Sequence, residues 1–366
     1  MSQGMAGPPT RTPPALQTLV LALALGIMVG WLLYVGRSII VPLVVAVVVV
    51  YVIIGLARFL DHVPWIGHHI PGWARHVFSI LVIVAGLGTI VSLIVSNVNQ
   101  VAAVAPRYES TLLGFAQQIS EIFGFETQPT WTTIRDQVLN QIEFGTLIRT
   151  AVASLSGFVG VSAVVMIYVS FLLAERASFA AKIAHLSRDP ETLVEVNGVI
   201  RAVNERVSHY LALKTFINIL LGFVSWVAMS LAGVEFAAFW AVLIGLLNYI
   251  PYVGSFIGVT FPVLLSVVQF ADFGTVLTIA LLLTGVQIMV GNFIEPYVMG
   301  NSLNLSPTVI LIGLAFWGGL WGIPGAILSV PITASLVIVF ASFETTRPIA
   351  VLLSAKGEVG EPVDRG

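Results

Sequence analysis

"GNFIEPYVMG", residues 291–300, places a glutamate, Glu295, inside a long apolar block. From Thr215 to Phe343 the chain has no lysine, arginine or histidine, and its acidic residues there are Glu235, Asp272 and Glu295. A stretch of this length with so few charges does not supply the surface of a water-soluble domain. It predicts a block of membrane helices, in which the presence of a charged residue such as Glu295 requires an explanation.

The composition of the whole chain gives the same fold class. Of its 366 residues, 57% are hydrophobic and 9% are charged, and several apolar runs reach the length of about 20 residues that a membrane helix needs. We predict an all-α polytopic membrane protein with about five to eight membrane helices. The absence of cysteine excludes disulfides, thiolate metal sites and cysteine nucleophiles, and a net charge of −2 gives no argument for nucleic acid.

The chain divides into six predicted segments. Basic residues concentrate in the segments 58–76 and 175–214, which the positive-inside rule places in the cytoplasm together with both termini. We expect the glycine- and proline-rich start to be a flexible tail rather than a signal peptide, and the end from Ser354 to be disordered. The segments are a tail (1–14), three transmembrane helices (15–97), an extracytoplasmic helical subdomain (98–150), a transmembrane helix with a cytoplasmic helical segment (151–214), a transport core (215–345) and a cytoplasmic tail (346–366).

Glycine and proline interrupt the C-terminal block where helical hairpins are predicted. One hairpin covers 236–270 with its tip near 248–254, and the other covers 306–341 with its tip near 321–325. A full span at about 273–293 separates them, so the two hairpins are expected to enter from opposite faces and point towards each other. Both begin with Phe-Trp and reach an Ile-Pro tip. Ordinary full spans are the alternative to this re-entrant arrangement.

Two long motifs carry a family resemblance. "LLNYIPYVGSFIG" and "NFIEPYVMGNSLNLSPTVILIGLAFWGGLWGIPGAILSVPITA" resemble the signature of the autoinducer-2 exporter family, a group of PerM-like permeases, and the resemblance covers nearly the whole chain. It implies export of a small polar molecule such as autoinducer-2, although some relatives resemble sodium or lithium/proton antiporters. It also implies a homo-oligomer, with a pentamer as one form. Ser255 stands where proline is common, and Gly291 where a polar or acidic residue is expected.

Glu295 is the first candidate for a substrate or ion site. A charged side chain at the bilayer centre costs about 2.5–3.5 kcal/mol on insertion scales and usually faces a cavity or a partner. Its block contains no basic residue, so we expect no cationic partner from the same half. Glu295 would then carry a proton or a sodium ion. Its alternative role is structural, bonding free N–H groups beside Pro296 or lying at the interface.

Uncharged polar residues complete the predicted site. Asn248, Tyr252 and Asn292 are candidates for hydrogen bonds to a hydroxylated solute, and their alternative role is to join helices. Backbone hinges are predicted at Pro251, Gly254, Pro296, Gly300, Gly322, Pro324 and Gly325. Four histidines in the 62–76 loop are expected to give interfacial polarity rather than a metal site, and no cofactor is predicted.

Four functions remain open from the sequence. The first is a secondary transporter that exports a small polar solute, with ion coupling, and the second is a sodium or lithium/proton antiporter that uses Glu295. A missing Lys or Arg clamp in the C-terminal half favours a neutral or cationic solute, with membrane lipid as the other partner. The third is a membrane scaffold or sensor without transport. An intramembrane enzyme is disfavoured because the C-terminal half lacks His-Glu-x-x-His and a paired aspartate.

Overall fold

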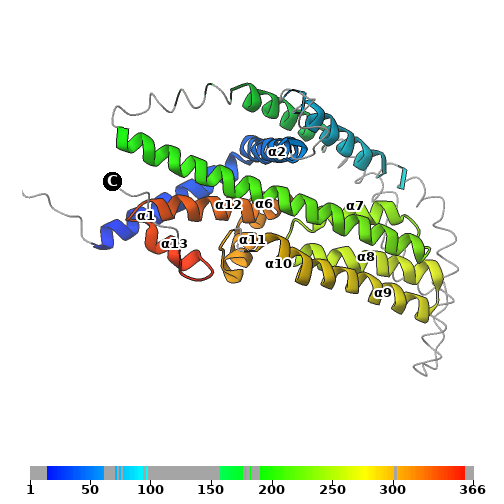
Figure 1. Ribbon diagram of the computed structural model, residues 1–366. Helices are drawn as coiled ribbons and strands as arrows, with labels where there is room; N and C mark the ends of the chain where they lie inside the picture. The colour runs from blue at the N-terminus through cyan, green and yellow to red at the C-terminus, as the bar shows by residue number, and fades with distance from the viewer. Residues whose placement is uncertain are drawn as a thin grey trace, which may run out of the picture.

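The computed structural model describes residues 15–61, 71, 74–75, 77–93, 96–97, 157, 159–175, 178, 182, 190–300 and 303–358. The predicted tail 1–14, the insert 98–150 and the four-histidine loop lie outside this part. Within it, all regular elements are helices and none is a β-strand (Figure 1). Five of these helices are long and apolar enough to cross a membrane, which confirms the all-α polytopic prediction.

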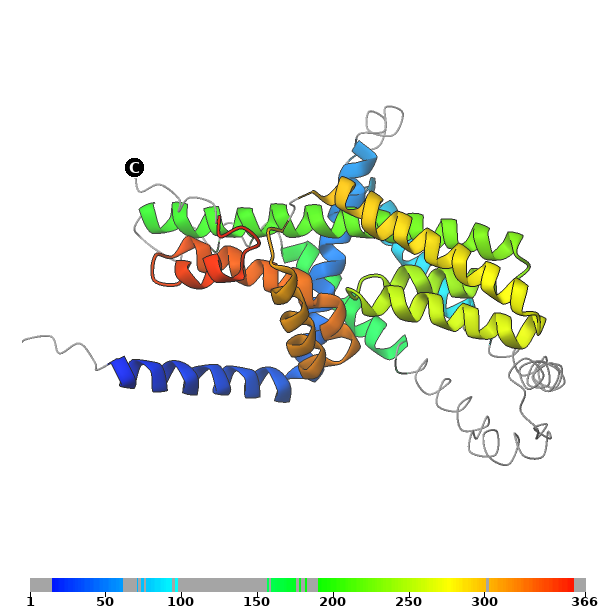
Figure 2. The same ribbon diagram turned by 90° about the horizontal axis from the view of Figure 1, so that it is seen from below.

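The N-terminal helices form the first layer. Helix α1 (Ala15–Val35) and helix α2 (Arg37–Asp61) are joined by a turn at Gly36. The side chains of α1 are largely exposed, and its C-terminal end approaches the other helices (Figure 2). Two further apolar helices are Val77–Leu93 and Val159–Glu175. The second of them packs on α2 through a small buried cluster of Ala46, Ile53, Val165 and Val169.

Helix α6 (Pro190–Leu231) is the axis of the molecule. It has 42 residues and is therefore about 63 Å long, so one uninterrupted helix runs from the predicted cytoplasmic helical segment into the predicted transport core. Two separate hydrophobic cores lie along it. The N-terminal core includes Val207 and Leu211 and is shared with α12 and α13, and the C-terminal core includes Ile217, Leu221 and Met229 and is shared with α7 and α9.

Both predicted helical hairpins are present. The first consists of α7 (Ala237–Leu247) and α8 (Val253–Phe270), and the second of α11 (Pro307–Trp321) and α12 (Ile323–Ser342). They lie along opposite halves of α6 (Figure 2). Helix α7 has 11 residues, a length of about 16 Å, and is too short to cross the hydrocarbon core. Re-entrant placement in the bilayer stays a prediction.

One glycine near each tip lets the two arms of its hairpin touch. A Cβ atom on Gly254 would lie 2.0 Å from the carbonyl oxygen of Leu247, and one on Gly325 would lie 1.9 Å from that of Trp317. The second arm of each hairpin therefore begins directly against the last turn of the first arm. The two hairpins are thus built in the same way, and the hinge role of both glycines stays a prediction.

The tips of the two hairpins contact different elements, and their predicted orientation towards each other stays a prediction. The tip of the second hairpin lies against α1, where the Trp321 Nε1–H donates to the Leu33 carbonyl oxygen at 3.1 Å. The tip of the first hairpin instead faces a cavity beside α6. Helix α6 extends past both hairpins, and each hairpin packs on its own core along that helix.

A single helical path from Phe273 to Met299 occupies the predicted full span and changes its winding near the end. It consists of α9 (Phe273–Ile288), the π-helical turn η2 (Met289–Ile294) and α10 (Glu295–Met299). The Glu295 N–H donates to Val290 O, five residues back, and Pro296 has no N–H to donate. The wider turn changes the direction of the side chains that follow it.

The expectation of a disordered end from Ser354 is wrong for its first residues. Helix α13 (Arg347–Leu353) buries Ala350 against α6 and α12, and residues 354–358, here called the C-terminal strap, then pair with the loop 303–306. The composition of this segment is that of a tail. Backbone hydrogen bonds to a partner loop are independent of composition, which is why the sequence did not indicate them.

Asp272 gives the first testable prediction. It is the N-cap of α9, where its Oδ2 accepts the Thr275 N–H at 2.7 Å, and hydrogen bonds from the side chain and backbone of Thr275 hold the pKa of Asp272 below its usual value. This stabilisation is complete above the unfolded pKa of about 3.9 and is lost as the pH falls through the lower folded pKa. Asp272→Ala should therefore lower the Tm at neutral pH, and the Tm values of the variant and the wild type should converge in acid. A constant difference across the pH range would contradict this.

Candidate functional site

A cavity of about 1070 Å³ lies where the first hairpin tip, α6, the π-helical turn and the C-terminal strap meet. It brings together most of the residues that the sequence predicted. Asn248, Pro251, Tyr252, Asn292, Glu295, Pro296 and Gly300 all line it. Gly254 lies beneath the same tip, whereas Gly322, Pro324 and Gly325 belong to the second tip and do not line the cavity. Ser255 and Gly291, the two departures from the family signature, also line it.

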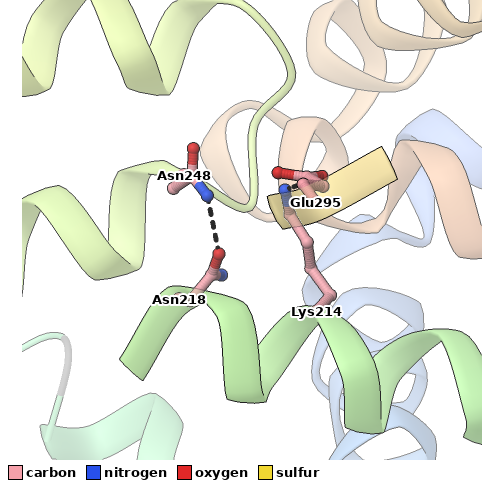
Figure 3. Close-up of polar contacts among 4 residues, drawn as sticks. All are labelled: Lys214, Asn218, Asn248 and Glu295. Carbon is pink, nitrogen blue, oxygen red and sulfur yellow. Dashed lines mark hydrogen bonds and ion pairs between the residues drawn. The ribbon is translucent and has the colours of Figure 1, made fainter. Parts of the chain in front are cut away.

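Glu295 has a cationic partner, which corrects the sequence prediction. The Lys214 Nζ lies 2.5 Å from Glu295 Oε1, and the two side chains are 7% and 25% exposed (Figure 3). The prediction counted charges only beyond Lys214 and did not consider this residue as a partner of Glu295. Because α6 continues unbroken through that position, it carries Lys214 to the junction between its two cores, beside α10.

A second polar pair lies one turn further along α6. Asn248 Nδ2 donates to Asn218 Oδ1 at 2.8 Å, and both residues are buried (Figure 3). Thr215 and Tyr249 are joined in the same way, with 2.7 Å between their hydroxyl oxygens. These bonds tie the tip of the first hairpin to α6. For Asn248, the structure therefore shows the helix-joining role that the sequence left open beside solute binding.

One face of α6 contributes to the site and was not predicted from the sequence. Tyr210, Lys214, Asn218 and Gly222 follow one another at intervals of four residues, and this spacing places them on one helix face. The first two line the cavity, Asn218 holds Asn248, and Gly222 lets α7 approach closely. The interval of four within the apolar run was the signal that could have identified this face.

The opposite wall comes from α9 and the π-helical turn. Its lining residues recur every three or four positions: Thr284, Gln287, Gly291 and Glu295. Gln287 Nε2 is buried and has no hydrogen-bond partner among the described residues. Leaving a buried donor without an acceptor is unfavourable by about 1–3 kcal/mol, so this atom is a candidate for bonding a solute. The sequence analysis did not select Gln287.

The C-terminal strap closes one end of the cavity. Ala355 N–H donates to Asn304 O and Ser306 N–H to Leu353 O, each at 3.1 Å, and Asn304 Nδ2 donates to Glu358 O at 2.5 Å. Asn304, Leu305 and Ala355 also line the cavity. A segment assigned to the tail by sequence thus forms part of the site.

A disulfide can test this closure. Leu305 and Ser354 form an antiparallel bridge between the two hydrogen bonds given above, which is a non-hydrogen-bonded pair with a Cα separation of about 4.5 Å, within the range of disulfides. Because the chain has no cysteine, Leu305→Cys with Ser354→Cys should give one reducible crosslink under mild oxidation. Leu305→Cys with Leu352→Cys is the control, since Leu352 is 80% exposed. Equal crosslinking in both variants would contradict the pairing.

The charges of the cavity cancel. Lys214 and Glu295 are the only Lys, Arg, His, Asp or Glu side chains among the described residues that line it. The rest of the lining is apolar or carries uncharged hydroxyl and amide groups. No group of three metal-ligating side chains occurs in the described part of the chain. The arrangement therefore fits an uncharged molecule with hydrogen-bonding groups better than an anion, which would meet a lysine that is already paired.

Comparison with known proteins identifies the family. A model of the AI-2E family transporter matches residues 20–344, which is most of the chain and includes the whole cavity apart from the strap. The chain belongs to the AI-2E transporter family. This confirms the family resemblance of the two signature motifs, and the protein is a membrane transport protein of that family.

Two bacterial relatives show how far the similarity extends. The "AI-2 transport protein TqsA" of Escherichia coli is 28% identical over 87% of this chain and 90% of its own length. The "Putative transport protein YhhT" of the same organism is 29% identical over 75% of this chain and 77% of its own length. Both matches therefore extend over most of the two chains compared rather than over one motif.

Proposed function

We propose that this AI-2E transporter exports a small, uncharged polar solute through the cavity beside Lys214 and Glu295, with coupling to an ion gradient. The supporting observation is a charge-neutral cavity whose wall holds an unpartnered buried donor, Gln287 Nε2. A hydroxyl or carbonyl oxygen of a solute would satisfy that donor. Because its relative TqsA is named an AI-2 transport protein, autoinducer-2 is the first solute to test.

The volume of the cavity supports the same class of solute. About 1070 Å³ is at the upper end of the usual range for small-molecule sites, and the lining combines apolar side chains with a few polar groups. Asn292 and Tyr252 remain proposed solute contacts, because both line the cavity and neither takes part in the Asn218–Asn248 pair. Pro251, Pro296 and Gly300 are the proposed hinges around it.

A sodium or lithium/proton antiporter is the second candidate. The observation in its favour is the carboxylate of Glu295 beside the π-helical turn, where Pro296 leaves a carbonyl oxygen without a helical N–H donor. A scaffold or sensor without transport is the third. From the distribution of basic residues we place the protein in a prokaryotic inner membrane with both termini in the cytoplasm. We further propose that it forms a homo-oligomer and that the exposed side chains of α1 contact membrane lipid.

The test is flux in proteoliposomes. Vesicles loaded with labelled autoinducer-2 or neutral polyols would report solute efflux. A pH dye inside the same vesicles would report proton flux after pulses of Na⁺ or Li⁺. We expect efflux of a neutral solute from the wild type, its loss in Glu295→Gln, and no change in Glu344→Gln, which alters an exposed glutamate outside the cavity. Proton flux with Na⁺ or Li⁺ alone would favour the antiporter, and no flux with any solute would favour the scaffold.

A further inference from the structure

We propose that Lys214 is a built-in counter-ion that occupies the cation position of Glu295 and so makes the cavity select neutral solutes over free cations. The inference rests on the proposed function in taking this cavity as the solute site. It assigns to Lys214 a specificity role that is separate from carrying the solute.

The geometry of the pair carries the first step. The Lys214 ammonium is in direct contact with the Glu295 carboxylate, at 2.5 Å, and its side chain is 7% exposed. It projects from α6 between Leu211 of one core and Ile217 of the other, so the helix holds it in place on both sides. A sodium or lithium ion that bound Glu295 would have to displace this ammonium. The displaced ammonium would stay buried without a counter-charge, which is strongly unfavourable.

The charge inventory carries the second step. No other carboxylate among the described residues lines the cavity, so neither a cation nor Lys214 finds a second carboxylate among them there. A neutral solute needs no such displacement, because it bonds to the amide and hydroxyl groups around an intact ion pair. The wild-type cavity therefore discriminates against free cations because the Lys214 ammonium already occupies the cation position at Glu295.

Removing the lysine should create the cation site that it blocks. In Lys214→Gln, the Glu295 carboxylate would line the cavity without its counter-ion, together with Asn292, which lies three residues earlier and also lines it. Carboxylate and carbonyl oxygens are the ligands that hard cations take. The variant should thus gain an affinity that the wild type lacks.

The experiment measures cation binding by purified full-length protein in detergent. Thermal unfolding is followed against LiCl or NaCl, with choline chloride keeping the ionic strength constant. We expect no specific shift for the wild type and an apparent affinity at least about tenfold tighter for Lys214→Gln. Lys182→Gln is the matched control, because it also breaks a Lys–Glu pair, with Glu175, but an exposed one outside the cavity. Lys214→Gln combined with Glu295→Gln should lose the gain.

Two results would overturn the inference. One is a wild-type affinity for Li⁺ or Na⁺ equal to that of Lys214→Gln, and the other is a folded Lys214→Gln protein without any gain. Lys214→Met, which keeps the apolar stem, replaces the glutamine variant if the latter does not purify. Because binding rather than flux is read, a gain in the variant stands even if no neutral solute is transported. Failure of the proposed function is thereby distinguished from failure of this inference.

Discussion

Gly325→Ala is expected to lower the free energy of unfolding by more than about 3 kcal/mol, with Gly254→Ala close behind. The added Cβ would lie 1.9 Å from the Trp317 carbonyl oxygen and 2.7 Å from its carbon, and at Gly254 the corresponding distances to Leu247 are 2.0 and 2.4 Å. These atoms are backbone, so no side-chain rotation relieves the clash. The last turn of α11 or α7 would have to unwind, and the hairpin would open.

The matched control is Gly319→Ala in α11, six residues from Gly325. An added Cβ there meets no atom within 4 Å, and alanine is the better helix former by about 0.5–1 kcal/mol. This variant should be as stable as the wild type or more so. Thermal unfolding of the three proteins in the same detergent measures the difference. A Gly325→Ala protein that melts together with Gly319→Ala would contradict the close contact at the tip.

The second large effect is expected at the ion pair. Glu295→Gln leaves the Lys214 ammonium, 7% exposed, without a counter-charge, and breaking a buried pair in this way costs about 3–5 kcal/mol. Lys214→Met leaves a carboxylate that is 25% exposed and should cost less. The double variant removes both charges and should be destabilised by less than the sum. We expect a coupling energy of about 2 kcal/mol or more from this double-mutant cycle.

The same cycle on Lys182 and Glu175 provides the reference. Their side chains are 60% and 58% exposed, and exposed pairs contribute about 0.2–1 kcal/mol. The two cycles are measured by chemical unfolding under identical salt. Equal coupling in both would mean that Lys214 and Glu295 interact as surface charges do, and the account of a sequestered pair would be wrong.

The hairpins were predictable from sequence because glycine and proline determine backbone geometry locally. Glycine is required at positions 254 and 325 because the backbone there touches carbonyl groups only seven and eight positions earlier. Both partners of each contact therefore lie within one short sequence motif. Glu295 was found because a carboxylate within an apolar run is conspicuous by itself. Both signals are short-range, and neither depends on how the helices pack.

What could not be predicted depends on contacts between distant segments. Lys214 and Glu295 are 81 positions apart, and their pairing follows from the packing of α10 on a continuous α6, whereas the sequence analysis ended one segment at 214. The strap was missed for the same reason, because its partners are backbone groups of the loop 303–306. Gln287 became a candidate only when its buried Nε2 was found without a partner among the described residues.

The most direct test of the central claim, that this cavity is the solute path, compares cysteines at two adjacent positions. Ile288 lines the cavity and is 48% exposed, whereas Met289 is 46% exposed and does not line it. The chain has no cysteine, so each variant carries a single reactive thiol. In proteoliposomes, a charged thiol reagent should stop flux through Ile288→Cys, and the solute should slow this reaction, while Met289→Cys keeps its flux. Flux that survives full modification of Ile288→Cys, or is lost equally in both variants, would contradict the claim.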